Sequence, residues 1–117
     1  IESVAYQTYD LFEAMKHDGL RPRLVKVDGG MVMNNWFSQF LSNVVDIKVL
    51  RPKVQETTAL GAAFMAGLQI GVYKSLKDIS KNWHLDKDFT PKISSKERSN
   101  LVKGWSTAIK KTLTKTI

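Results

Sequence analysis

The sequence contains no cysteine, which excludes structural disulfides and thiol catalysis. It also has no apolar run long enough to cross a bilayer, since the longest, residues 59–68, is short and rich in small residues. The basic start and apolar stretch of a secretory signal are missing as well. We therefore expect a cytoplasmic protein with no membrane partner.

Residue types that carry metal or nucleophile chemistry are scarce. The two histidines, His17 and His84, have no second ligand at a metal-binding spacing. There is no Gly-Lys-Ser/Thr phosphate loop, and the three-glycine dinucleotide fingerprint is incomplete. The sequence therefore offers no candidate catalytic residue and no candidate metal ligand.

Positive charge is concentrated in one part of the chain, whose net charge is +7. Residues 1–73 balance seven Lys/Arg with seven Asp/Glu, whereas residues 74–117 hold eleven Lys/Arg against four Asp/Glu. Such a basic segment is typical either of a nucleic-acid-binding surface or of a solvated helical face. Because nearly all of these cations are lysines, which make poor bidentate contacts with bases, we expect the solvated face and no nucleic-acid partner.

Hydrophobic periodicity predicts alternating helices and strands. In chain order we expect a helix at 1–18, a buried strand at 23–28, a helix at 32–45 and a strand at 47–50. These are followed by a helix from Glu56 or Thr57 to about residue 70, a short helix at 75–83, a connector at 86–91, and a last helix from Ser94 or Ser95 to about residue 114. This order implies an α/β fold in which short parallel strands are joined by crossover helices, followed by a helical C-terminal tail.

Two of the expected helices have distinctive faces. In the helix at 32–45, apolar residues recur at i, i+3, i+4 and i+7, so we expect Trp36, Phe37 and Phe40 to lie in the core rather than to stack on bases. The helix at 57–70 carries a stripe of small residues that would let a second backbone approach closely. The stripe consists of Ala59, Ala62, Ala63, Ala66 and Gly67.

The pattern predicts a partial domain, because two strands alone make a poor sheet. The first residue, Ile1, is not Met and already fits the first helical pattern, which suggests that the sequence begins inside a longer protein. We expect residues 1–117 to form one partial domain, with an α/β core at 1–73 and a basic helical tail at 74–117.

The stretch most suggestive of chemistry is a double glycine between an expected strand and an expected helix. Gly29 and Gly30 leave a sharp turn without side chains, so that main-chain amides and the helix start can reach an anion such as a phosphate. Asn34 is expected in the first helical turn, where its amide can donate and accept as the edge of an adenine requires. Asp28 could cap the helix or bind through its carboxylate. On pattern alone, a plain tight turn is the better explanation of the stretch.

Three stretches together suggest a family. They are Val27–Gly30 with Asn34-Asn35, then Arg51–Ala63 followed by Ala66-Gly67, and finally Phe89-Thr90-Pro91 with Gly104-Trp105. They resemble the C-terminal end of glycerol kinases, within the wider family of carbohydrate kinases. The run Arg-Pro-x-Val-x-Glu-Thr-Thr looks like glycerol kinases in particular. Pentulose or gluconate kinases, and a small basic nucleic-acid-binding module, are the alternatives.

The resemblance implies a fold, an activity and a site. The chain would be part of an actin- and hexokinase-like (ribonuclease H-like) ATPase lobe in an ATP:glycerol phosphotransferase that makes glycerol 3-phosphate. Gly30 would approach the nucleotide phosphates through its backbone, Gly29 would shape the turn, and Asn34 would lie beside the adenine.

The resemblance also implies what the chain leaves to other parts of the enzyme. ATP or ADP would bind with magnesium, whose ligands lie outside these 117 residues, as do the glycerol contacts and the carboxylate base. We expect the complete protein to be a homo-oligomer that uses ATP and glycerol, and the isolated chain to lack kinase activity.

Overall fold

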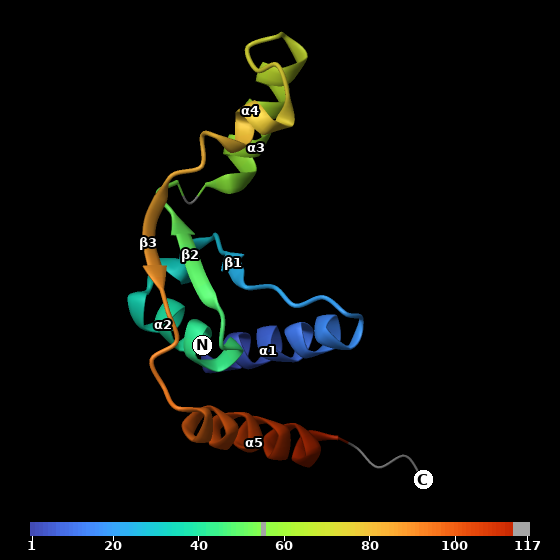
Figure 1. Ribbon diagram of the computed structural model, residues 1–117, viewed down its shortest axis with the longest axis vertical. Coiled ribbons are helices and arrows are strands. Elements are labelled where there is room, and N and C mark those ends of the chain that lie inside the picture. The colour runs from blue at the N-terminus through green and yellow to red at the C-terminus, as the bar shows by residue number, and fades with distance from the viewer. Residues whose placement is uncertain (55, 114–117) are drawn as a thin grey trace.

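The described part of the chain, residues 1–54 and 56–113 of a computed structural model, forms a small sheet with helices beside it (Figure 1). Its strands, in their order across the sheet, are β1 (Leu24–Lys26), β2 (Lys48–Pro52) and β3 (Leu85–Phe89). β1 and β2 are parallel, with Leu24 opposite Lys48. The helix between them makes the crossover connection that the sequence predicted.

Helices α1 (Glu2–His17) and α2 (Asn35–Val45) pack on each other, and α2 also packs on the sheet. Their apolar faces meet Val49 of β2 and Phe89 of β3 in one buried cluster. Burial of this cluster is the main source of stability that the described residues can supply, because it removes apolar surface from water. It also fixes the β1–α2–β2 unit, which carries the double glycine.

One predicted core residue lies at the surface instead. Phe37 is 3% exposed, as expected, but Trp36 is 52% exposed. Trp36 stacks on the half-buried Phe40, with 5.0 Å between ring centroids. The prediction of a core position is therefore wrong for Trp36. The helix buries Phe37 and Leu41 more deeply, so Trp36 falls at the edge of the apolar stripe.

β3 corrects the expectation of a connector at 86–91 and of a purely helical tail. It pairs antiparallel with β2, with Val49 opposite Phe89. Its polar sequence does not read as a strand. Tertiary contacts stabilise this strand although its residues have low intrinsic strand propensity. They are the pairing with β2, the burial of Phe89 and an ion pair of 2.9 Å between Lys48 and Asp88.

β1 is shorter and more exposed than the buried strand expected at 23–28. Leu24 is 49% exposed, and only Val25 of the three residues is partly buried. The reason is position, since β1 lies at one edge of the sheet formed by the described residues. An edge strand covered on one side buries fewer side chains than a central one.

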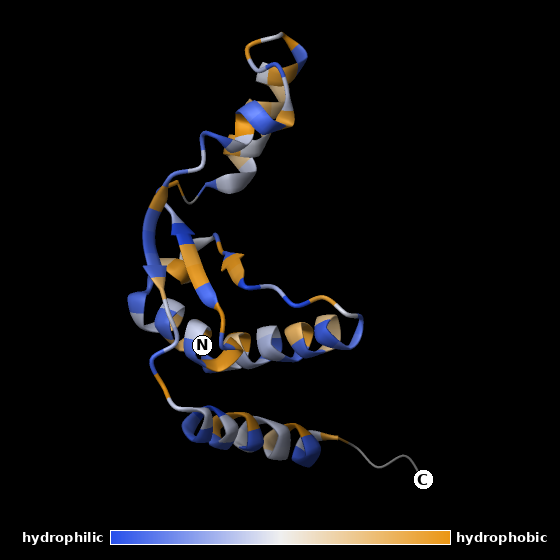
Figure 2. Cartoon of the chain, viewed as in Figure 1, coloured by the Kyte–Doolittle hydropathy of each residue, from blue (hydrophilic) through white to orange (hydrophobic). Residues whose placement is uncertain are grey.

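Helices α3 (Thr57–Gln69) and α4 (Leu76–Ser80) form an arm that projects away from the sheet (Figure 1). The helix predicted from residue 57 is confirmed, whereas Gln55 lies outside the described residues. At Gly67, a Cβ would lie 2.8 Å from the Tyr73 ring, so the close neighbour there is a side chain and not the second backbone that the stripe predicted. The alanines of the small-residue stripe are exposed, and Figure 2 shows apolar residues along the arm.

Helix α5 (Ser95–Thr112) follows the sheet and lies beside α1 and α2 (Figure 1). Its tryptophan, Trp105, stacks on Tyr6 with 5.3 Å between centroids and donates to Asp10 at 2.9 Å. Arg98 donates to the Asn43 carbonyl at 2.6 Å. The predicted end near residue 114 lies outside the described residues. Among the described residues, 1–54 and 56–113, no helix is both long and apolar enough to cross a membrane.

The start of α5 has the predicted serine cap. Ser94 Oγ accepts from the Glu97 amide at 3.2 Å, and the Glu97 carboxylate accepts from the Ser94 amide at 2.8 Å. The Ser94 amide and, at 2.9 Å, the Ser94 hydroxyl both donate to this carboxylate and lower the pKa of Glu97 below its ordinary value of 4.5, with the backbone bond as the larger cause.

We expect loss of this cap to open the first turn of α5. Ser94→Ala should speed amide exchange at residues 95–98 roughly fivefold, as measured by hydrogen–deuterium exchange.

The stability of this cap should also depend on pH. Because the folded pKa of Glu97 is lowered, the stabilising contribution of its carboxylate is complete above pH 4.5 and is lost as the pH falls through that lowered pKa. In Glu97→Gln, amide exchange at residues 95–98 should no longer depend on pH in this way. The same pH dependence of exchange in the wild type and in Glu97→Gln would contradict this role of the carboxylate.

Candidate functional site

The double glycine forms an open corner between β1 and α2, which we call the glycine corner (residues 28–30). Gly29 has φ 94° and ψ 169°, a conformation that side-chain-bearing residues rarely adopt. A Cβ placed on Gly30 would have nothing within 4 Å, and Gly30 is exposed. The backbone at Gly30 is therefore accessible to a ligand from solvent.

The segment between the glycine corner and α2 is a separate turn rather than the start of the helix. A 3-10 turn, η1 (Gly30–Met33), precedes α2, and Asn34 lies between the two. Asn34 is thus the N-cap of α2 and not a residue of its first turn, which corrects the prediction. Its Oδ1 accepts from the Phe37 amide at 3.2 Å. The side-chain nitrogen of an asparagine in this role can still donate to a ligand.

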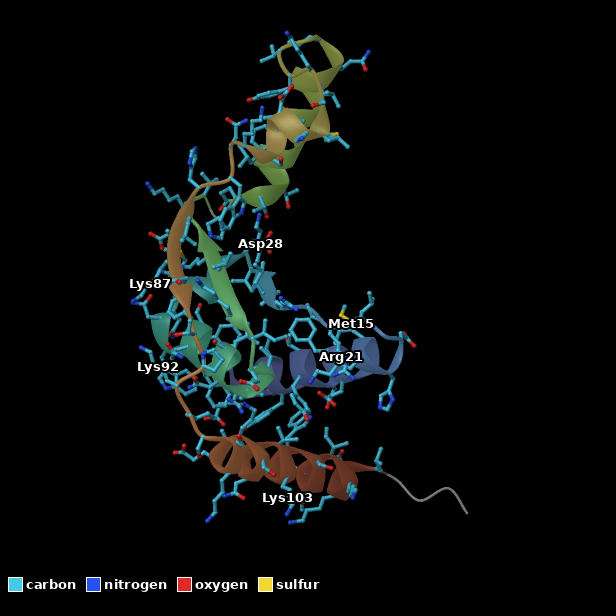
Figure 3. The ribbon with its side chains drawn as sticks, in the orientation of Figure 1. Met15, Arg21, Asp28, Lys87, Lys92 and Lys103 are labelled. Atoms are coloured by element: carbon cyan, nitrogen blue, oxygen red, sulfur yellow. The ribbon has the colours of Figure 1, made fainter. Side chains whose placement is uncertain are left out.

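Asp28 does not have the capping role that was one of the two considered from the sequence. η1 has no side-chain cap, so Asp28 does not cap it. Its carboxylate instead accepts a hydrogen bond from the hydroxyl of Thr57, the first residue of α3. In Figure 3, Asp28 lies between the end of β1 and the start of α3. This bond joins the glycine corner to the arm.

Arg51 is the site residue that sequence reasoning missed. It lies on β2 and is only 6% exposed. Its Nη1 donates to the carbonyl of Val32 at 2.9 Å and to that of Met33 at 3.3 Å, both within η1. One signal was available: an arginine that directly follows apolar strand residues such as Val49 and Leu50 is seldom buried without specific partners.

Two open cavities flank the segment that leads from the glycine corner into α2. The first, of about 290 Å³, lies between α1 and this segment. It is lined by Val4, Thr8, Val25, Lys26, Val27, Asp28, Met31, Val32, Phe37 and Leu41. The second, of about 510 Å³, lies between the start of α2 and β3, where Lys87 and Lys92 point outward (Figure 3). Gly29, Gly30 and Asn34 are not among the residues that line these two cavities.

The three residues predicted to bind nucleotide, Gly29, Gly30 and Asn34, are brought together by this geometry. Gly29 and Gly30 form the corner, and Asn34 ends the turn that follows. In the part of the chain that the structure describes, no group of three His, Cys, Asp or Glu residues is placed to hold a metal ion. The arrangement can present main-chain amides and one amide side chain to an anionic ligand with a polar ring.

The sequence is similar to that of carbohydrate kinases. Residues 1–70 match the FGGY family of carbohydrate kinases, C-terminal domain. The chain is 50% identical to a glycerol kinase of Gluconobacter oxydans over 97% of its length, and 49% identical to glycerol kinase 1 of Pseudomonas aeruginosa over 95%. It spans only 22% of each of those proteins.

Solved structures show the same likeness. A crystal structure of Plasmodium falciparum glycerol kinase with ADP matches 98% of this chain with a TM-score of 0.81 and 31% identity, and the chain covers 23% of that structure. A xylulose kinase of Lactobacillus acidophilus matches 95% of the chain and is itself covered to 24%, with a TM-score of 0.75. At 20% identity, this second match concerns the fold alone. The predicted fold class and the resemblance to glycerol kinases are both confirmed.

Proposed function

Because the chain belongs to the FGGY family of carbohydrate kinases, we propose that it is the C-terminal portion of an ATP:glycerol phosphotransferase. Several relatives of about 50% identity are glycerol kinases, which favours glycerol over a pentulose or gluconate as the substrate of the complete enzyme. The observation that carries the proposal is the glycine corner, because it exposes backbone at the start of η1, where main-chain amides can bind a phosphate chain.

We propose that Gly29, Gly30 and Asn34 contribute the nucleotide contacts. The space at Gly30 is open to a ligand, since a Cβ there would meet no protein atom within 4 Å. Gly29 supplies the positive φ of the turn. Asn34 uses its oxygen as a cap and retains its amide nitrogen for the adenine edge. The structure of the Plasmodium relative with ADP supports a nucleotide as the ligand.

The remaining parts of the reaction are assigned to the rest of the enzyme. Phosphoryl transfer from ATP needs magnesium to neutralise the phosphates and a base to accept the proton of the attacking hydroxyl. We propose that the magnesium ligands, the base and the glycerol contacts lie outside this chain. Residues 1–117 would then be one partial domain of the nucleotide-binding lobe in a cytoplasmic homo-oligomer.

We expect the complete protein to phosphorylate glycerol with ATP and magnesium. A coupled assay for ADP release, run with glycerol, xylulose and gluconate in parallel, tests the substrate. Glycerol should give a kcat/KM at least about a hundredfold above the other two, because a site that hydrogen-bonds one polyol leaves polar groups unpaired with another. A higher kcat/KM for xylulose or gluconate would show that glycerol is not the preferred substrate, without contradicting membership of the carbohydrate kinase family.

A further inference from the structure

We propose that Arg51 is a positioning residue that holds the glycine corner and Asn34 in the geometry that binds nucleotide. The inference rests on the proposed nucleotide site, and it assigns a role to a residue that does not itself face the ligand. Arg51 lies on β2, on the inner side of η1. Its contacts determine where η1 lies relative to the sheet.

The guanidinium binds two groups of partners in opposite directions. Nη1 donates to the carbonyls of η1 and to Asn35 Oδ1, the last at 2.9 Å. Nε and Nη2 both bind Asp86 Oδ2 on β3, at 2.9 Å and 2.8 Å. The rigid, planar fork of arginine makes both sets possible at once. β3 and η1 are therefore linked through one side chain.

The same carbonyls constrain the residues that are proposed to bind nucleotide. The Val32 carbonyl also accepts from the fully buried Ser38 hydroxyl at 2.8 Å. Because a peptide unit is planar, fixing this carbonyl also fixes the direction of the amide that follows it. η1 begins at Gly30 and ends next to Asn34, so a shift of its carbonyls would move both residues.

Stability of the sheet alone does not require this arginine. Burying a charged pair costs desolvation, and an apolar side chain in a strand is often at least as stabilising. Nη1 of Arg51 is used on η1 and on Asn35, whereas Nε and Nη2 bind Asp86 of β3, a strand whose backbone is already paired with β2. The link from the sheet to η1 is thus the feature that Nη1 maintains.

The test is a comparison of Michaelis constants in the complete enzyme. Arg51→Lys keeps the charge but cannot span η1 and Asp86 together. We expect the KM for ATP to rise roughly tenfold while the KM for glycerol changes less than about twofold. An unchanged KM for ATP, or equal rises for both substrates, would overturn the proposal.

A matched control separates positioning from stability. Arg98 is also largely buried and joins α5 to the Asn43 carbonyl and to Asp46, away from the glycine corner. Arg98→Lys should lower the melting temperature as Arg51→Lys does, yet leave the KM for ATP unchanged. A rise in the KM for ATP in both variants would assign the effect to general destabilisation and overturn the role of Arg51.

A milder variant covers the case in which Arg51→Lys does not fold. Asp86 has a side chain that is 42% exposed, and Asp86→Asn keeps its shape while removing the charge that orients Arg51. We expect the KM for ATP to rise about threefold, with that for glycerol unchanged. No change in the KM for ATP in this variant would also overturn the proposal.

Direct binding of ADP separates this inference from the proposed function. If the wild-type protein binds ADP by calorimetry but does not phosphorylate glycerol, the proposed substrate fails while Arg51 can still be tested. Weaker ADP binding in Arg51→Lys, with unchanged binding in Arg98→Lys, supports the positioning role. Equal affinity for ADP in all three proteins refutes it.

Discussion

In the complete enzyme, Gly30→Asp is expected to reduce kcat/KM for ATP by about a hundredfold or more while leaving the protein folded. Gly30 has an ordinary backbone conformation, and a Cβ there meets no atom within 4 Å. A carboxylate at the first position of η1 even interacts favourably with the amides at the start of the turn. The same charge would occupy the space proposed for the phosphates and repel them. Steady-state kinetics with varied ATP, together with thermal unfolding, measures both effects.

Two neighbouring substitutions calibrate this result. Gly30→Ala adds volume without charge and should cost less than Gly30→Asp in kcat/KM. Gly29→Ala should lower stability, since Gly29 has φ 94°, where an L-residue is strained. If Gly30→Asp is as active as the wild type, phosphates do not approach this corner, and the proposed nucleotide site is wrong.

The sequence predicted those parts of the fold that depend on neighbouring residues. The apolar spacing of α2, the start of α3 and the serine at the N-cap of α5 are local signals, and each matches the structure. β3 depends on pairing with β2, which lies more than thirty residues earlier, and its own charged sequence favours no strand. Trp36 was misplaced because its exposure depends on how α2 is rotated against the sheet.

The candidate site divides in the same way. The glycine corner follows from a sequence motif, since two glycines between a strand and a helix limit the possible local geometries. Asn34 as the N-cap depends on where η1 ends, which no periodicity reveals. The bonds from Arg51 to η1 and from Thr57 to Asp28 join residues 18 to 29 positions apart. Such contacts are set by tertiary structure. The sequence could supply only one signal for them, namely the arginine beside apolar strand residues.

The isolated 117-residue chain is expected to show no phosphorylation of glycerol, with turnover more than about 10⁵-fold below that of the complete enzyme. Positioning two substrates and a catalytic base supplies an advantage of at least that size, and a chain carrying one side of the nucleotide site can hold only one substrate. Near the glycine corner, the Asp28 carboxylate accepts a hydrogen bond from the Thr57 hydroxyl.

This absence of turnover is informative only if the isolated chain retains the corner. Saturation-transfer NMR with ADP on the isolated chain, with Gly30→Asp as its control, asks whether nucleotide still binds. Weak ADP binding that the substitution removes, together with no transfer to glycerol, would locate binding here and chemistry elsewhere. Measurable transfer to glycerol by the isolated chain would mean that a base and a polyol site lie within these residues. The division of labour proposed here between this chain and the rest of the enzyme would then be wrong.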